Sequence, residues 1–308
     1  MSMGFSRKLR CLLLSTAALS LCFVMTACAD SGEAAPEDGE QAAFSVPTAP
    51  PAAATPAYDE VRVYFDGLLT DRGYFSGNTV YLAPDAICDF YGLELTTRSD
   101  GSGFQLTAGG VELSGAYGQD YMEADSRYLF SPDGYLTANG KVYLPSDVIE
   151  RVFGVSVDIS FQPLRADVGT GGLNLIRGGE DYYDMRFATE DLYWLTHIIY
   201  AEAREQPLAG QIGVGNVIFN RIESDDFPDT IFDVIFDRSH AVQFDPTADG
   251  GVLSEPDEMS LIAACLCLEG YNTVGKSLFF VNPATGDSSW FEAELTFVIT
   301  IGEHDFYA

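Results

Sequence analysis

Glu202 and Glu205 lie where a hydrophobic helix is expected to end, in the stretch "IIYAEAREQPLAG". Apolar residues at helical spacing form one face of this helix, which continues to Glu202: Leu192, Leu195 and Ile199. Desolvation there and the negative end of the helix dipole both favour the neutral carboxyl group, so Glu202 is a candidate general acid. The alternative is a helix-end glutamate paired with Arg204 or Arg221, and spacing alone favours neither.

The elements around Glu202 can be read from local signals. Thr189 before two acidic residues predicts the helix start, and Pro207 stops or restarts the helix. The segment from Pro207 to Ser224 has a second helical repeat of apolar residues and contains Gly210, Gly213 and Gly215. Glycine weakens a helix by up to about 1 kcal/mol, so three of them suggest a close helix–helix approach. The acid is therefore expected in a cleft between helices.

Other chemistries find less support. Cys265 and Cys267 stand in the apolar helical run "LIAACLCLEG", where a thiol is more often buried than activated by His240 or His304. The three histidines of the chain are widely spaced and form no recognised metal-ligand pattern, so no metal or cofactor is predicted. His304 is expected to be structural.

Composition narrows the classes of partner. The chain has 308 residues, a hydrophobic fraction of 47% and a formal net charge of −30. That length suggests two globular domains. Binding to nucleic acid is not expected, because phosphate neutralisation needs clustered lysines and arginines.

The N-terminus has the form of a secretory signal, with Arg7, Lys8 and Arg10 before an apolar run that ends in "MTAC". This ending resembles the lipobox of bacterial lipoproteins, which implies cleavage after residue 27 and a lipid on Cys28. A transmembrane anchor is the alternative, but the run is barely long enough to span a bilayer. Residues 28–57, rich in Ala, Pro, Ser and acids, are predicted to be a flexible tether.

An internal repeat organises the next region. "VYLAPDAICDFYGLEL" from Val80 and "VYLPSDVIERVFGVSV" from Val142 align without a gap, and each predicts a strand, a helix and a strand. The turns "SGN" and "ANGK" before them suit hairpins. Residues 58–168 are therefore predicted to form an α+β module of two β-α-β units.

This module resembles the copper amine oxidase N-terminal-like (stalk) domains of secreted proteins. No copper is inferred, because the module contains no histidine. A spacer or wall-binding role is expected for it. Residues 169–186 are predicted to be a linker, in which Leu173 to Ile176 could pack on a neighbour, and the last domain spans residues 187–308.

The last domain carries several ordered motifs, which are "YAEAREQPLAGQIGVGNVIFNRI", "FPDTIFDVIF", "VQFDPTADG", "EGYNTVGKSLFFVNP" and "IGEHDFYA". In this order they resemble the SleB-type cell wall hydrolases, the spore-cortex-lytic enzyme family. The resemblance implies a mostly helical, lysozyme-like domain that cleaves between N-acetylmuramic acid and N-acetylglucosamine in peptidoglycan.

The same resemblance implies roles for single residues. Glu202 takes the place of the catalytic glutamate, and Gln243 and Phe244 form a "QF" motif, in which the amide could bond an acetamido group and the ring could pack on a sugar. Further residues are implied to line or support the groove: Asn220, Arg221, Asn282, Trp290 and Tyr307. The chain departs from the family after "EAR", where Glu205-Gln206 replaces Gly-Glu, which puts in question whether activity is altered.

The implied reaction is lytic transglycosylation, in which one glutamate suffices because the C6 hydroxyl of the sugar attacks and leaves a 1,6-anhydro end. Asp245 and Asp249 are the candidates for a second carboxylate, which hydrolysis by water would need, although Asp-Pro and Asp-Gly more often form turns. The other alternative is a wall-binding lipoprotein without turnover. The expected partners are peptidoglycan glycan strands and a membrane holding the lipid of Cys28, and the expected location is the outer face of a Gram-positive-type cell or spore membrane.

Overall fold

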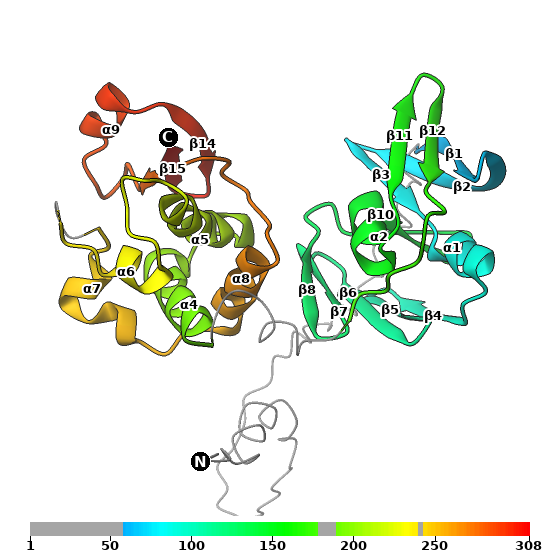
Figure 1. Cartoon of the computed structure of the whole chain (residues 1–308), viewed down its shortest axis with the longest axis horizontal. Coiled ribbons are helices and arrows are strands. Elements are labelled where there is room, and N and C mark those ends of the chain that lie inside the picture. Colours follow the sequence, from blue (N-terminus) through cyan, green and yellow to red (C-terminus); the bar gives the residue numbers. More distant parts are fainter. Residues whose placement is uncertain (1–57, 178–188, 240–242) are drawn as a thin grey trace, which may run out of the picture. The chain divides into compact units, whose positions relative to one another are not determined.

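The computed structural model describes residues 58–177, 189–239 and 243–308 (Figure 1). The chain from Pro56 to Ala308 forms one compact unit. The expected signal segment, Cys28 and the tether lie outside the described residues, as do residues 178–188 and His240. Within the described ranges, no helix is long and apolar enough to cross a membrane.

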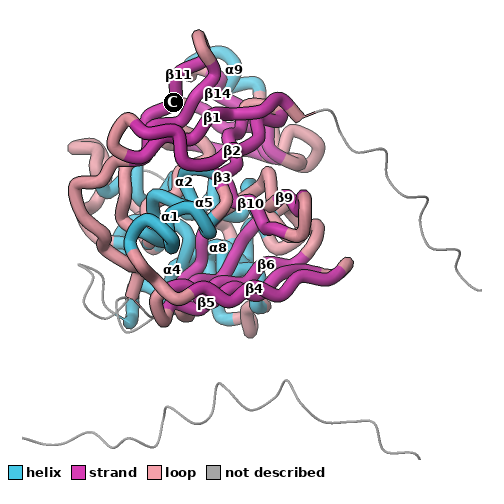
Figure 2. Tube along the Cα trace, turned by 90° about the vertical axis from the view of Figure 1, so that its right-hand side faces the viewer, coloured by secondary structure: helices cyan, strands magenta, loops and turns pink. Residues whose placement is uncertain are grey.

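Residues 58–168 fold into two sheets with two helices between them (Figure 2). The first sheet has the strand order β11-β12-β1-β2-β3-β10-β9, and the second has the order β4-β5-β6-β7-β8. The helices are α1 (Pro84–Tyr91) and α2 (Ser146–Phe153). The strands are β1 (Asp59–Phe65), β2 (Leu68–Ser76), β3 (Thr79–Leu82), β4 (Leu95–Asp100), β5 (Gly103–Ala108), β6 (Val111–Ala116), β7 (Tyr121–Ala124), β8 (Arg127–Phe130), β9 (Leu136–Ala138), β10 (Lys141–Pro145), β11 (Val157–Phe161) and β12 (Leu164–Val168).

The internal repeat has a structural counterpart. Its copies are β3-α1-β4 and β10-α2-β11, and β3 pairs with β10 in antiparallel register, with Leu82 opposite Leu144. The glycines matched in the repeat, Gly92 and Gly154, end the two helices in the left-handed conformation, with φ of 66° and 64°. A glycine in this position lets the chain leave the helix without a Cβ clash. The repeat therefore predicts both helices and their ends correctly.

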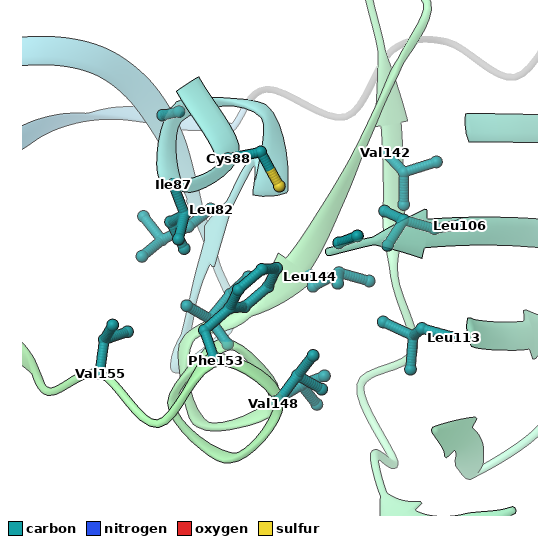
Figure 3. Close-up of a cluster of buried hydrophobic side chains, with 14 of the residues drawn as sticks. Leu82, Ile87, Cys88, Leu106, Leu113, Val142, Leu144, Val148, Phe153 and Val155 are labelled. Carbon is teal, nitrogen blue, oxygen red and sulfur yellow. The ribbon is translucent and has the colours of Figure 1, made fainter. Parts of the chain in front are cut away.

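The repeat does not predict how its strands are distributed. β4 joins the second sheet rather than the sheet of β3, and β5 to β9 lie between the two copies in sequence. One core nevertheless joins both sheets and both helices, because each contributes buried side chains to it (Figure 3). Labelled there are Leu82, Ile87, Cys88, Leu106, Leu113, Val142, Leu144, Val148, Phe153 and Val155.

Residues 169–177, the described part of the expected linker, pack on this module. Ile176 is buried, and its backbone N–H donates to the carbonyl of Val152 over 2.9 Å. Leu173 and Leu175 pack against the same core. The expectation that Leu173 to Ile176 pack on a neighbour is confirmed.

The last domain is mostly helical, as expected, but also contains a small sheet with the order β13-β15-β14. Its strands are β13 (Phe279–Val281), β14 (Phe297–Ile301) and β15 (His304–Tyr307). Its helices are α4 (Thr189–Ala203), α5 (Leu208–Ile222), α6 (Ile231–Ile235), α7 (Pro246–Asp249), α8 (Glu258–Leu268) and α9 (Ser289–Glu294), with the 3-10 turn η1 (Gly251–Leu253).

Helices α4, α5 and α8 pack on one another, and the glycines of α5 explain how closely. A Cβ at Gly215 would lie 2.5 Å from Sγ of Cys267 on α8 and 3.1 Å from Cδ1 of Ile199 on α4. A Cβ at Gly213 would lie 2.8 Å from the Phe306 ring on β15. The close helix–helix approach predicted from these glycines is confirmed at Gly215, whereas Gly213 makes room for a strand residue instead of a helix.

An ion pair joins β8 to the end of α8. Arg127 donates through Nε and Nη2 to both carboxylate oxygens of Glu269, at 2.7 Å and 2.5 Å, and the Glu269 side chain is 3% exposed. Arg151 of α2 donates to the Glu269 carbonyl and lies 4.0 Å from the centroid of the Tyr271 ring. The first module thus makes specific polar contacts with the last domain.

Candidate active site

Glu202 stands in the last turn of α4, at the end of a buried apolar stripe. Leu195 and Ile199 on the same face are fully buried, and Glu202 itself is half-buried. The pKa of its carboxyl is raised to about 7, first by burial and then by the nearby carboxylates of Asp245 and Asp249. In the part of the chain that the structure describes, no ion pair joins Glu202 to Arg204 or Arg221. The arrangement suits a carboxyl group that keeps its proton near neutral pH.

Two carboxylates approach Glu202 from the short helix α7 and its flank. Asp245 is exposed and lines the same groove as Glu202. Asp249 accepts a hydrogen bond of 2.8 Å from the backbone N–H of Gly251, which is the turn-forming role expected for it. Of the two candidates for a second carboxylate, Asp245 is the one that the groove exposes to a ligand.

Glu202 lines a groove of about 1220 Å³ that runs between the end of α4 and the small sheet. One part of its wall is aromatic, with Phe227, Phe279, Phe280, Trp290 and Phe291. Its acidic side chains are Glu202, Glu205, Asp226, Asp237, Asp245 and Glu303, against the two guanidinium groups of Arg204 and Arg221. A groove with this lining favours an uncharged, hydroxyl-rich ligand whose ring faces can stack on aromatic side chains.

Four of the expected binding residues line this groove: Gln243, Arg221, Asn282 and Trp290. Trp290 is 53% exposed, and its ring packs edge-to-face with Phe279 and Phe291. Asn282 donates through Nδ2 to the carboxylate of Glu303 over 3.2 Å, so that its amide is held at the groove. The structure therefore brings these residues together with Glu202, although they come from five separate segments of the domain.

Three other expected residues support the groove without facing it. The Phe244 ring is 1% exposed and packs 6.3 Å from the Phe280 ring, so it offers no face to a sugar. Tyr307 is 3% exposed, with its ring against Phe291. Asn220 donates through Nδ2 to the carbonyls of Gly275 and Ser277, which fixes the loop before β13.

Arg221 is held under the groove by unusual neighbours for a charged group. Its guanidinium carbon lies 4.9 Å, 5.3 Å and 5.4 Å from the ring centroids of Phe227, Phe244 and Phe279. Its Nε donates to the Leu278 carbonyl over 2.8 Å. Burial lowers the pKa of Arg221 to about 10, so the group stays charged at neutral pH. Cation–π contacts with three rings compensate part of its desolvation.

Sequence reasoning did not assign several of the groove-lining residues to this site. Gln206 and Glu303 both line the groove, and the Gln206 side chain accepts a hydrogen bond of 2.8 Å from the Glu303 backbone N–H. His304 also lines the groove, although it was expected to be only structural. The one signal in the sequence was that Gln206 and Glu303 stand within motifs of the family resemblance. Their contact with each other does not follow from local spacing.

The cysteines do not offer an alternative nucleophile. Cys265 and Cys267 are buried, and the Cys267 thiol donates to the Ile212 carbonyl. Burial raises the pKa of Cys267 well above its ordinary value, which opposes formation of the thiolate. The expectation of core thiols is confirmed.

The part of the chain that forms this groove is similar to known proteins. Residues 205–307 match the model of the Cell Wall Hydrolase family. The spore cortex-lytic enzyme of Oceanobacillus iheyensis is 33% identical over 122 residues, which are 40% of this chain and 40% of that enzyme. The enzyme of the same name from Halalkalibacterium halodurans is 33% identical over 120 residues, 39% of this chain and 35% of that enzyme. The matches thus span about two fifths of the length of these relatives.

Two solved structures are similar to the same part of the chain. The catalytic domain of the germination-specific lytic transglycosylase SleB from Bacillus anthracis is 31% identical, with 40% of this chain and 98% of that chain covered and a TM-score of 0.37. The catalytic domain of the Bacillus cereus SleB protein is 32% identical, with 40% and 92% covered and a TM-score of 0.36. The family match begins at Glu205, three residues after Glu202. Residues 205–307 of this chain belong to the Cell Wall Hydrolase family, and their relatives are spore cortex-lytic enzymes.

Proposed function

We propose that this protein cleaves the glycan strands of peptidoglycan by lytic transglycosylation, with Glu202 as the only catalytic carboxyl group. The observation that carries this proposal is a half-buried glutamate with a pKa of about 7 in a groove of about 1220 Å³, whose lining combines aromatic side chains with more acidic than basic groups. A general acid works best when its pKa lies near the working pH. The similarity to spore cortex-lytic enzymes supports peptidoglycan as the substrate.

In the proposed reaction Glu202 changes from acid to base. Its proton passes to the glycosidic oxygen while the bond from that oxygen to C1 of the N-acetylmuramic acid breaks. The C6 hydroxyl of the same sugar then bonds to C1, and the Glu202 carboxylate accepts the hydroxyl proton. The products are a free 4-hydroxyl on N-acetylglucosamine and a 1,6-anhydro end, and Glu202 is protonated again. The reaction consumes no water and needs no second carboxylate.

Two alternatives follow from other features. Hydrolysis of the same bond by water would use Asp245, which the groove exposes, as the base. A wall-binding protein without turnover would bind glycan in the groove without cleaving it. The reason to consider this alternative is that Glu205-Gln206 replaces the Gly-Glu of the family resemblance.

Mass analysis of the glycan fragments separates the three possibilities. Purified peptidoglycan is digested with the wild-type chain and with Glu202→Gln, and the new ends are identified. Anhydro ends, lighter than reducing ends by one water, are expected from the wild type only. Reducing ends in the wild-type digest would show that the bond is hydrolysed by water. Glycan that stays intact with the wild type would favour a binding protein without turnover.

We further propose that the chain is held outside the cell membrane by a lipid on Cys28, which would place the groove at the wall. The N-terminal sequence alone supports this proposal. Cys28→Ala is expected to move the protein from the membrane fraction to the medium or the soluble fraction. Unchanged membrane association would remove the lipid anchor from the proposal but leave the glycan chemistry intact.

A further inference from the structure

Buried polar atoms without a partner are rare in folded proteins, so each one calls for an explanation. Three such side-chain atoms occur among the described residues: Nη1 of Arg221, the hydroxyl of Tyr271 and Nδ1 of His304. Tyr271 lies at the contact with Arg151, away from the groove. Arg221 and His304 both line the groove that holds Glu202.

His304 occupies a place where packing alone would favour an apolar side chain. It is 5% exposed at the start of β15, the central strand of the small sheet. Its ring lies 5.2 Å from the Phe280 ring and 6.2 Å from the Phe306 ring. An imidazole in this position pays a desolvation penalty that a hydrocarbon would avoid. The fold therefore keeps a buried ring nitrogen, Nδ1, that has no hydrogen-bond partner among the described residues.

The charge state of His304 limits what it can bind. Burial lowers the pKa of His304 below its ordinary value although Glu303 and Asp305 pull it upward, which favours the neutral ring. A neutral imidazole has one N–H donor and one acceptor nitrogen. Such a pair suits an amide or a hydroxyl group better than a carboxylate, and the carboxylates of the groove also repel anions.

The position of His304 relative to Glu202 is fixed by a backbone contact. The N–H of Glu303, next to His304, donates to the side-chain oxygen of Gln206 over 2.8 Å. Gln206 follows Glu202 by four residues, at the corner between α4 and α5. The strand end that carries His304 is thus held to the helix end that carries the acid.

We propose that His304 is a glycan-positioning residue, whose neutral imidazole forms a hydrogen bond with an acetamido or hydroxyl group of the sugar bound beside Glu202. The proposal rests on the proposed function, because it takes the ligand of the groove to be a glycan. His304 does not take part in the proton transfer. Its contact holds the sugar equally in the ground state and in the transition state.

Three variants in the full chain test this role. His304→Phe keeps an aromatic ring beside Phe280 and removes both nitrogens, whereas His304→Asn and His304→Gln place an amide near Nδ1 and near Nε2, respectively. A lost hydrogen bond to a neutral group is expected to raise KM about three- to tenfold in His304→Phe, with kcat within about twofold. At least one of the two amides is expected to restore KM, and it identifies the nitrogen that binds.

A matched control comes from the same hairpin. Thr300 donates to the Asp305 carboxylate over 2.5 Å and does not line the groove, so Thr300→Val is expected to leave KM unchanged. An unchanged KM in His304→Phe would overturn the proposal. An equal rise of KM in all three His304 variants, with a lower melting temperature in each, would assign the residue to packing and also overturn it.

A binding experiment separates this proposal from the proposed function. Glu202→Gln and Glu202→Gln/His304→Phe are titrated with glycan strands freed of their stem peptides by an amidase. The double variant is expected to bind about three- to tenfold more weakly than the single variant, whether or not the wild type cleaves. Equal affinities would overturn the role of His304 and leave the catalytic role of Glu202 standing.

Discussion

The side-chain oxygen of Gln206 accepts a hydrogen bond of 2.8 Å from the backbone N–H of Glu303. This contact ties the corner between α4 and α5 to the turn between β14 and β15, which are 97 residues apart in the chain. The Gln206 carbonyl accepts a second bond, from Nε2 of Gln211. The residue at which the chain departs from the family resemblance thus holds two walls of the groove together. A carboxylate could also accept the Glu303 N–H, so the departure preserves this contact.

Gln206→Ala should lower the free energy of unfolding by about 1 kcal/mol, because it removes the acceptor of the Glu303 N–H. Gln206→Glu keeps an acceptor there and should cost less. Thermal unfolding of the two variants measures the difference. Equal melting temperatures for wild type and Gln206→Ala would show that the contact does not support the fold.

Glu202→Gln should reduce glycan cleavage by about 10²- to 10⁴-fold, because an amide cannot donate the required proton. The wild-type rate should fall as the pH rises above about 7, where the Glu202 carboxyl loses its proton. Initial rates measured between pH 5 and pH 9 give the pH at which the rate begins to fall. A rate that continues to rise through pH 8 would contradict the assignment of Glu202 as the acid.

The same pKa has a consequence for stability. The folded-state pKa of Glu202 is raised above its unfolded value, so the folded protein binds the proton more tightly and loses stability as the pH rises through about 7. Glu202→Gln has no charge to bury and should be the more stable form at pH 8. Denaturant unfolding of the wild type and Glu202→Gln at pH 5 and pH 8 measures this difference. If Glu202→Gln were more stable than the wild type only at pH 5, the result would contradict the raised pKa.

Asp245→Asn should lower the pKa of Glu202, since it removes the larger of the two carboxylate contributions. The alkaline limb of the rate profile should then shift to lower pH while the maximal rate changes little. Asp225, exposed and outside the groove, provides the matched control Asp225→Asn. Loss of cleavage at every pH in Asp245→Asn would instead identify Asp245 as a base and favour hydrolysis by water.

Gly215→Ala should destabilise the last domain by about 1–3 kcal/mol, because the new methyl group would overlap Sγ of Cys267. Gly210→Ala in the same helix is the control, since its Cβ would approach nothing closer than 3.2 Å. Alanine also has the higher helix propensity at both positions. The melting temperature of Gly215→Ala should be lower than that of Gly210→Ala. A Gly215→Ala variant that is more stable than Gly210→Ala would argue against this packing.

Arg127→Met should cost about 3–5 kcal/mol, because it leaves the Glu269 carboxylate buried without its guanidinium partner. Arg127→Met/Glu269→Met should recover much of that loss, since no buried charge then remains. Chemical unfolding of the wild type, both single variants and the double variant gives the coupling energy. Additive effects would mean that the pair does not join the first module to the last domain.

The sequence by itself determined the local structure around the acid. Thr189 and Pro207 mark the two ends of the segment, and the stripe of Leu195 and Ile199 leads to Glu202 because helical spacing is a local property of the chain. The repeat likewise predicted α1 and α2 with their terminal glycines. These features depend on backbone conformation and periodicity, which neighbouring residues fix.

Only the tertiary structure decided which residues meet at the groove. Phe244 and Tyr307 became buried supports, whereas Asp245, Gln206 and His304 came to line the groove. These outcomes depend on how α4, α5, α7 and the small sheet pack, and segments up to about a hundred residues apart contribute to that packing. No local sequence pattern predicts this outcome, because whether a side chain is buried or lines the groove depends on which distant segments pack against it.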